Sequence, residues 1–184
     1  MKTKKMIFIQ SRRRKIENIQ KEFPNAQIID VTSKGELPYV KFSPFYPIGN
    51  IPIPNSKNVY SASVEGIWQG LKVFTNVDID ESKFSITKMK GLKRTVRKYG
   101  KPLGHRNGLN GIELLDYISA RKLIYLPIYN WVLENKLSDE INKLEAIHKK
   151  RDIVLLDYET NENINDVRKP LSHASLIKQY LLNR

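Results

Sequence analysis

Apolar residues in the first forty positions fall into two short runs that flank a helical pattern. Residues 6–10 (MIFIQ) and 26–32 (AQIIDVT) are apolar runs of strand length, rich in β-forming side chains. Between them lies a helical pattern that Ser11 can cap and Pro24 ends. Residues 1–40 therefore predict a small β-α-β segment.

The rest of the chain combines a proline-rich stretch with longer helical patterns. Residues 33–58 hold five prolines, which forbid a long helix, so an ordered loop with short extended pieces is expected. Apolar residues recur at helical spacing in 111–135, where Pro127 should kink or divide the helix, and again in 137–150. Residues 152–160 form a last apolar run, which predicts a buried strand before a C-terminal helix.

Together these elements predict an α+β fold, in which one helix-rich domain with a small β-sheet spans residues 1–184. Residues 41–184 would form its core. Hydrophobic residues make up 40% of the chain, which is enough for a packed core and too much for a disordered chain. No apolar run approaches the about 18 residues that span a bilayer, and none is typical of a signal peptide. We therefore expect a cytoplasmic protein without a membrane partner.

Charge is the strongest signal in the composition. The chain has 32 lysines and arginines against 19 acids, which gives a formal net charge of +13. Such an excess favours a polyanionic partner, because each neutralised phosphate releases counterions. The alternative is that the lysines serve solubility alone. We expect nucleic acid or a nucleotide phosphate as the partner, with DNA favoured over RNA; the oligomeric state is not predicted.

Positive charge concentrates in residues 88–111, which contain eight basic residues and no acid. Five glycines in the same segment would let its loop approach a phosphate backbone closely. His105 and Arg106 are the only long polar tips of that loop, so we expect them to contact substrate. The alternative is a solvated basic face with a flexible loop. The predicted nucleic-acid-binding residues are Lys88, Lys90, Lys93, Arg94, Arg97, Lys98 and Lys101.

The segment YSASVEGIWQGLKVF (60–74) predicts a helix with an acid at the margin of its apolar face. Glu65 and Trp68 are i, i+3 neighbours, Glu65 and Gln69 are i, i+4 neighbours, and Lys72 lies one further turn from Trp68. An acid beside aromatic side chains suits a flat ring and a developing positive charge. The alternative is an ordinary ion pair between Glu65 and Lys72 or a nearby arginine on the surface.

Two glycines in this helix carry the same ambiguity. Gly66 and Gly70 each cost about 1 kcal/mol relative to alanine inside a helix. That cost is tolerated where a ligand or another backbone must come close. The glycines therefore mark either a ligand site or a close helix packing.

Two motifs in this order resemble the NADAR superfamily. SPFYP (43–47) is similar to the family's S-N-F-Y-P-like stretch, with Pro44 in place of Asn. SVEGIWQGLK (63–72) is similar to the V-E-H motif that carries an aromatic residue, Gln and Lys on the following turns, with Trp68 as the aromatic residue and Gly66 in place of His. Residues 153–182 are weakly similar to the family's C-terminal layout without its usual Trp-Gly. The matching residues are Ser43, Phe45, Tyr46 and Pro47 in the first motif and Val64, Glu65, Gln69 and Lys72 in the second.

The resemblance implies a NADAR-like fold and cleavage of N-glycosidic bonds in nucleotide-like substrates, including removal of ADP-ribose from guanine bases. Glu65 would then be the catalytic acid and Lys72 a substrate or phosphate contact. The other substrate-binding residues would be Ser43, Phe45, Tyr46, Trp68 and Gln69.

The chemistry fits these residue types. Breaking a C1′–N bond passes through an oxocarbenium-like state. A carboxylate can stabilise the positive charge of that state, or it can orient the attacking water. We expect no cofactor and no metal, because the three histidines lack metal-ligand spacing and the chain has no cysteine. Asp157 and Glu159 share one face of the late strand, and we expect Asp157 as a second catalytic carboxylate.

These features predict an N-glycosidase that acts on a modified or ADP-ribosylated base in nucleic acid, in phage–host conflict or in DNA repair. Two alternatives remain open. One is the same chemistry on a free nucleotide metabolite, and the other is a non-catalytic nucleic-acid-binding protein.

Overall fold

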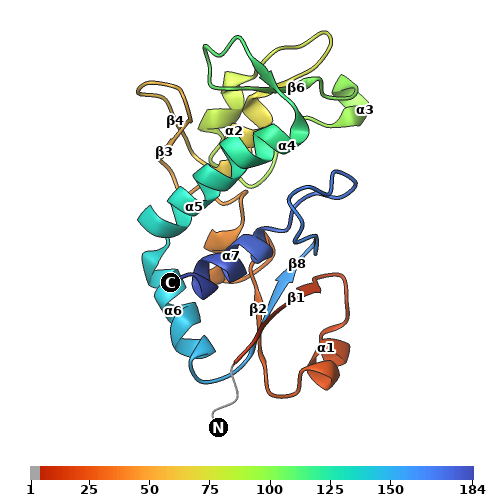
Figure 1. Cartoon of the computed structure of the whole chain (residues 1–184), viewed down its shortest axis with the longest axis vertical. Coiled ribbons are helices and arrows are strands. Elements are labelled where there is room, and N and C mark those ends of the chain that lie inside the picture. Colours follow the sequence, from red (N-terminus) through yellow and green to blue (C-terminus); the bar gives the residue numbers. More distant parts are fainter. Residues whose placement is uncertain (1–4) are drawn as a thin grey trace. The chain divides into compact units, whose positions relative to one another are not determined.

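The computed structural model describes residues 5–184 as a mixture of helices and small sheets (Figure 1). Helices hold 37% of the chain and strands 16%, so the predicted helix-rich α+β class is confirmed. The chain forms two compact units. Unit 1 combines the segment that ends at Ser43 with residues 133–184, and unit 2 comprises Pro44–Val132.

Unit 1 is built around a parallel sheet. Its elements are β1 (Ile7–Ser11), α1 (Ile16–Glu22), β2 (Gln27–Asp30), the 3-10 helix η1 (Tyr39–Phe42), α6 (Ser138–His148), β8 (Ile153–Asp157) and α7 (His173–Leu182).

Unit 2 contains shorter elements. They are β3 (Ile51–Pro52), β4 (Tyr60–Ser61), α2 (Val64–Gly70), β5 (Lys72–Val73), the 3-10 helix η2 (Glu81–Ser85), α3 (Val96–Tyr99), β6 (Gly104–Arg106), β7 (Leu114–Leu115), α4 (Tyr117–Ala120) and the π-helix η3 (Arg121–Tyr125). The helix α5 (Leu126–Asn135) begins in unit 2 and ends in unit 1.

The predicted β-α-β segment is present, but its two strands do not pair with each other. The strand β8 lies between them and pairs in parallel with both, so that Ile153 is opposite Ile7 on one side and Gln27 on the other. All five residues of β8 are buried, as expected for the central strand of a parallel sheet with both faces covered. The helix α1 begins at Ile16, so Ser11 ends a strand and caps no helix.

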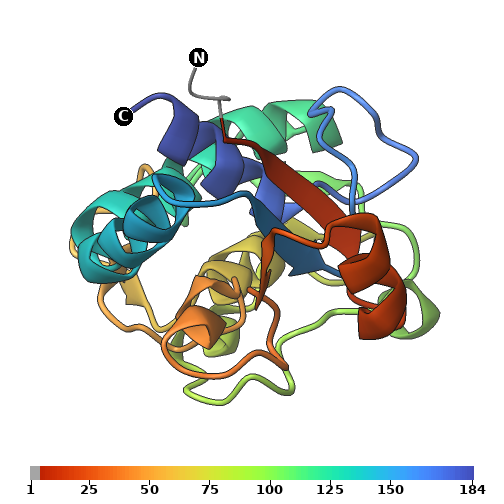
Figure 2. The ribbon, with the colours of Figure 1, turned by 90° about the horizontal axis from the view of Figure 1, so that it is seen from below.

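Helices cover both faces of this sheet (Figure 2). Ile19 of α1 packs against Val154 and Leu156 on one face. Because side chains alternate along a strand, Asp157 points to the opposite face, where it contacts the beginning of α7. The carboxyl end of β8 and the N-terminus of α7 are thereby joined.

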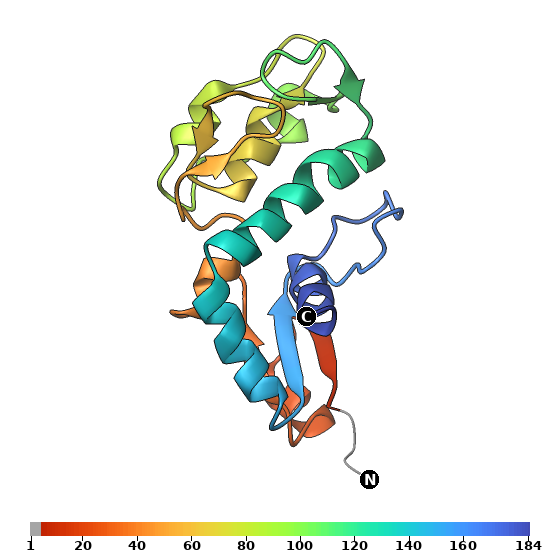
Figure 3. The same ribbon diagram turned by 60° about the vertical axis from the view of Figure 1, so that its left-hand side comes forward.

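Residues 111–135 do not form the single helix that the apolar pattern predicts. The chain first makes the strand β7, and α4, η3 and α5 then follow without interruption (Figure 3). Pro127 lies in the first turn of α5 and does not divide the helix, so of the two expected effects the division is not observed. Proline lacks an N–H and crowds the preceding turn, and the wider π-helical turn Arg121–Tyr125 stands directly before it.

The other broad predictions fit the described structure. Residues 33–58 form a loop with short 3-10 and extended pieces, and α6 occupies most of 137–150. Across residues 5–184, no helix combines the length and the apolar character that crossing a membrane requires.

Candidate functional site

The beginning of α2 is tied to the proline-rich loop through backbone groups. The Ser63 side chain caps α2 by accepting a hydrogen bond from the N–H of Gly66, with the two atoms 3.0 Å apart. The N–H of Glu65 donates to the carbonyl of Pro44 at 2.8 Å. The two motifs that carry the NADAR resemblance are therefore joined directly in unit 2. The preceding Ser43 is buried.

Glu65 is a buried carboxylate at the start of a chain of polar groups. Only 8% of its surface is exposed. Gln69 Nε2 donates to Glu65 Oε1 at 2.6 Å, and Lys72 Nζ donates to Gln69 Oε1 at 3.1 Å. The N–H of Arg94 also donates to Gln69 Oε1, at 3.0 Å. Glu65 is therefore inside the unit and not on the surface, and an amide side chain links it to Lys72.

Lys72 is half-buried and lies opposite His105 in the antiparallel pair of β5 and β6. Burial lowers the pKa of Lys72, and the nearby Glu65 charge opposes that effect. The site thus contains a carboxylate and an ammonium that are linked through one amide side chain.

His105 lies inside unit 2 and is not the tip of a loop, which corrects our expectation. It belongs to β6, is 2% exposed, and its ring lies 3.9 Å from that of Trp68, centroid to centroid. Burial and the Lys72 charge lower its pKa to about 3, so the imidazole is neutral at pH 7. A backbone group of Trp68 opposes this lowering, although within residues 5–184 neither ring nitrogen has a partner at ordinary hydrogen-bond distance and angle.

Aromatic side chains surround Trp68 on several sides. Besides His105, Tyr125 meets the indole edge-on at 5.5 Å and Tyr117 lies 6.0 Å away. The sequence patterns missed both tyrosines as neighbours of the site, because the helix α4–η3 that carries them is distant from α2 along the chain. Of the aromatic residues in the proline-rich loop, Phe45 is half-buried beneath the Lys93 ammonium, 5.5 Å from the ring centroid. Tyr46 is also half-buried.

The glycines of α2 serve close packing, which decides between the two interpretations given above. A side chain at Gly66 would lie 2.7 Å from the carbonyl oxygen of Lys83, and one at Gly70 would collide with the ring of Phe84. Both contacts belong to η2, which packs against α2. The glycines therefore bring η2 close and leave no space for a ligand at these two positions.

Two of the predicted contact residues are occupied within the protein. Arg94 is 2% exposed; its guanidinium donates to the carbonyls of Lys72 at 2.6 Å and Asp78 at 2.7 Å. Arg94 therefore joins two backbone segments inside unit 2. It does not belong to the exposed nucleic-acid-binding surface where we expected it. Arg106 grips the Asp78 carboxylate through two nitrogens, at 3.1 and 2.7 Å, and holds the pKa of that acid below its ordinary value. Arg106 therefore makes a structural ion pair with Asp78 and is not an unpaired side chain at the tip of a loop.

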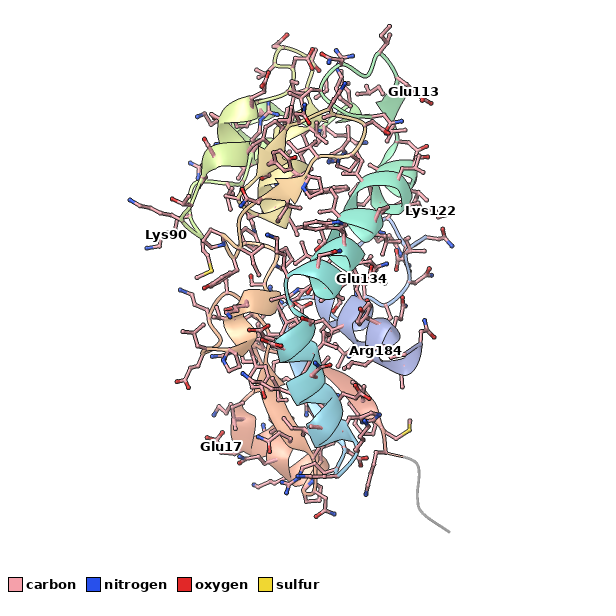
Figure 4. All side chains as sticks on the ribbon, turned by 90° about the vertical axis from the view of Figure 1, so that its left-hand side faces the viewer. Glu17, Lys90, Glu113, Lys122, Glu134 and Arg184 are labelled. Carbon is pink, nitrogen blue, oxygen red and sulfur yellow. The ribbon has the colours of Figure 1, made fainter. Side chains whose placement is uncertain are left out.

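The other six residues of the basic run are exposed and lack acidic partners. Within the part of the chain that the structure describes, no carboxylate lies within 4.0 Å of any of these ammonium or guanidinium groups. Lys90 extends from the surface of unit 2 (Figure 4). These residues are Lys88, Lys90, Lys93, Arg97, Lys98 and Lys101, and we call them the open cations.

Asp157 belongs to unit 1, where three groups contact one oxygen of its carboxylate. Its Oδ2 accepts from the Ser172 hydroxyl at 2.8 Å and the Ala174 N–H at 3.2 Å, and it pairs with His173 Nδ1 at 2.9 Å. The other His173 nitrogen lies 2.8 Å from the carbonyl of Val31. Burial alone would raise the pKa of Asp157, but the His173 charge and these donors hold it at about 2. His173 is the first residue of α7.

No three histidine or acidic side chains between residues 5 and 184 gather as metal ligands would. The chain belongs to a family of unknown function, DUF6939, whose model matches residues 11–177. No curated protein and no solved structure shows significant similarity to it. The resemblance to NADAR proteins, and what it implies, therefore stays a prediction.

Proposed function

We propose that the protein is an N-glycosidase that hydrolyses the bond between the sugar and a modified or ADP-ribosylated base in nucleic acid, with DNA favoured over RNA. The observation that carries this proposal is the buried Glu65 carboxylate, linked through Gln69 to Lys72 and joined to the SPFYP loop at Pro44. The motif resemblance points in the same direction. The biological setting would be phage–host conflict or DNA repair.

The reaction uses Glu65 at the sugar. As the C1′–N bond breaks, positive charge develops on C1′ and the ring oxygen, and a buried carboxylate stabilises that charge far more than an exposed one would. The water oxygen then bonds to C1′ and the water gives up one proton, while the electron pair of the broken C1′–N bond leaves with the base. Lys72, whose ammonium donates to one oxygen only among the described contacts, supplies a charge for a phosphate or sugar oxygen.

The aromatic residues and the open cations supply binding. Trp68 and Phe45 are half-buried aromatic residues, the side-chain type that stacks against a flat base. The open cations supply the phosphate contacts, because a cation without an acidic partner can release counterions from a nucleic acid. A base inside a duplex would first have to be flipped out.

Replacement of Glu65 by Gln tests the proposal. We expect base release from nucleic acid that carries modified or ADP-ribosylated bases to fall on the order of 10³-fold, measured by mass spectrometry of the released bases. Glu113→Gln is the matched control, because Glu113 is an exposed acid of the same unit. Undiminished release by Glu65→Gln would end the glycosidase proposal.

A non-catalytic nucleic-acid-binding protein is the second candidate, because the open cations do not depend on Glu65. It predicts binding that is insensitive to Glu65→Gln and no product from any nucleotide.

A free nucleotide metabolite as substrate is the third candidate. It is favoured by the single ammonium of Lys72, which one amide links to Glu65. Salt titration of DNA binding separates a nucleic-acid partner from a free nucleotide. Contacts to several phosphates make the logarithm of the affinity fall with the logarithm of the salt concentration, with a slope of about 0.9 for each phosphate. An enzyme for a free nucleotide would bind DNA weakly and with little salt dependence.

A further inference from the structure

The orientation of the Gln69 side chain is determined by its neighbours. The Arg94 backbone N–H and the Lys72 ammonium both point at one atom of the amide, at 3.0 and 3.1 Å, and both groups can only donate. That atom must therefore be the amide oxygen. The NH₂ group is then directed to Glu65 at 2.6 Å, and a flipped amide would set donor against donor twice.

Burial favours the neutral acid at Glu65, and the Gln69 donor opposes that effect by favouring the charged form. An N–H donor stabilises a carboxylate more than a carboxylic acid. Glu65 also lies in the first turn of α2, where backbone N–H groups favour negative charge. Gln69 itself is 5% exposed and its oxygen is occupied, so it has little left to offer a substrate.

We infer that Gln69 is a positioning residue that holds Glu65 as a carboxylate, so that Glu65 acts as a base and charge stabiliser and not as the acid that the resemblance implies. The inference rests on the proposed function. In the step, the water oxygen bonds to C1′, the water proton goes to the Glu65 carboxylate, and the C1′–N electron pair goes to the base.

The inference narrows the substrate class. A neutral base that receives no proton would leave as an anion, whereas a base with a positive ring leaves as a neutral molecule. The fitting substrates are therefore cationic bases such as ring-alkylated purines. We expect release of 7-methylguanine to exceed release of hypoxanthine, a neutral base, by at least about 100-fold per site in otherwise identical DNA. Equal release of the two bases would overturn the inference.

The pH dependence of Gln69→Glu tests the positioning role. The new acid keeps an oxygen for Arg94 and Lys72 but sets a second carboxylate against Glu65, so the two share a proton. We expect the acidic limb of the pH–rate profile to move upward by on the order of one pH unit. Gln20→Glu, at an exposed position in unit 1, is the control and should leave the limb in place.

A carbon-13 NMR titration of the Glu65 carboxyl, assigned with Glu65→Gln, gives the same information without turnover. The titration midpoint of Glu65 should move to higher pH in Gln69→Glu and stay in place in Gln20→Glu. Circular dichroism shows whether each variant is folded. If Gln69→Glu does not fold, Gln69→Leu replaces it, because it removes the donor without adding charge. An unmoved midpoint with Glu65→Gln inactive would overturn only this inference. Full activity of Glu65→Gln would instead overturn the proposed function.

Discussion

The two units each contain a buried carboxylate, and the partners of these acids differ in kind. Asp157 in unit 1 accepts from a serine hydroxyl and a backbone N–H and pairs with a histidine that is itself anchored to a backbone carbonyl. Glu65 in unit 2 accepts from an amide whose oxygen is shared by Lys72 and a backbone N–H. Asp157 joins β8 to α7 and has a structural role. Glu65 is held by an amide side chain that a lysine ammonium and a backbone N–H fix in place, which suits a group that must react.

The largest expected effect on stability comes from Asp157→Asn. The change leaves the His173 charge buried without its partner, so the free energy of unfolding should fall by about 3–5 kcal/mol. Urea unfolding measures it. Glu159→Gln, two residues along, is the control, because its 3.8 Å pair with Arg13 is largely exposed and contributes little. A loss below about 1 kcal/mol for Asp157→Asn would remove the structural role of this acid.

The two buried histidines should respond to pH in opposite directions. Its pKa in the folded protein, about 3, is below the ordinary 6.5, so the unfolded chain binds the proton first. Stability from this site is complete above pH 6.5 and is lost as pH falls toward 3, by at most about 1.4 kcal/mol per pH unit. His105→Leu should remove that slope in urea titrations at pH 4.5, 5.5 and 6.5. An unchanged slope would mean that His105 reaches solvent or a partner.

The Asp157–His173 pair sets a different pH window. The Asp157 pKa is lowered from 3.8 to about 2, so its contribution is complete above pH 4 and is lost as pH falls toward 2. Burial alone would lower the pKa of His173, but the Asp157 carboxylate raises it above 6.5; its contribution is present below pH 6.5 and is lost as pH rises through the raised value. The stability difference between wild type and His173→Gln should therefore be greatest between about pH 4 and 6.5 and smaller above. A difference that grows above pH 7 would contradict the pairing.

The sequence predicted the class of the fold and the neighbourhood of Glu65, because both follow from local patterns. The apolar runs located β1, β2 and β8 to within a few residues, and the i, i+4 spacing placed Gln69 beside Glu65. The order of the strands could not be predicted, because β8 pairs with residues more than a hundred positions away. The two-residue strands that set Lys72 opposite His105 are too short for any periodicity to reveal.

The basic residues show the same limit. Arg12, Arg13 and Arg14 are a second basic run, in unit 1, and each is paired, with Asp30 at 2.5 Å, Glu159 at 3.8 Å and Glu22 at 2.6 Å. In the run 88–111 of unit 2, Arg94 is buried and Arg106 pairs with Asp78. The six open cations have no acidic partner among the ion pairs of residues 5–184. Local charge density is similar, and the pairing that separates the two runs exists only in three dimensions.

The smallest expected effect tests that difference. Replacing Lys90 and Lys98 by Gln should lower DNA affinity roughly tenfold and reduce the salt slope by about 1 for each lost phosphate contact. Arg13→Gln should leave both unchanged, since its guanidinium is engaged by Glu159 and by the Tyr158 carbonyl and ring. Fluorescence anisotropy with labelled DNA measures both. An equal loss in the two variants would erase the distinction between the open cations and the paired arginines.

The most direct measurement compares Glu65→Gln and Asp157→Asn in base release per folded molecule, at a temperature where both variants are folded by circular dichroism. We expect Glu65→Gln to lose release on the order of 10³-fold with a melting temperature near that of wild type. Asp157→Asn should keep release within about threefold and lose thermal stability. The reverse pattern, with Asp157→Asn inactive and Glu65→Gln active, would contradict the assignment of chemistry to Glu65.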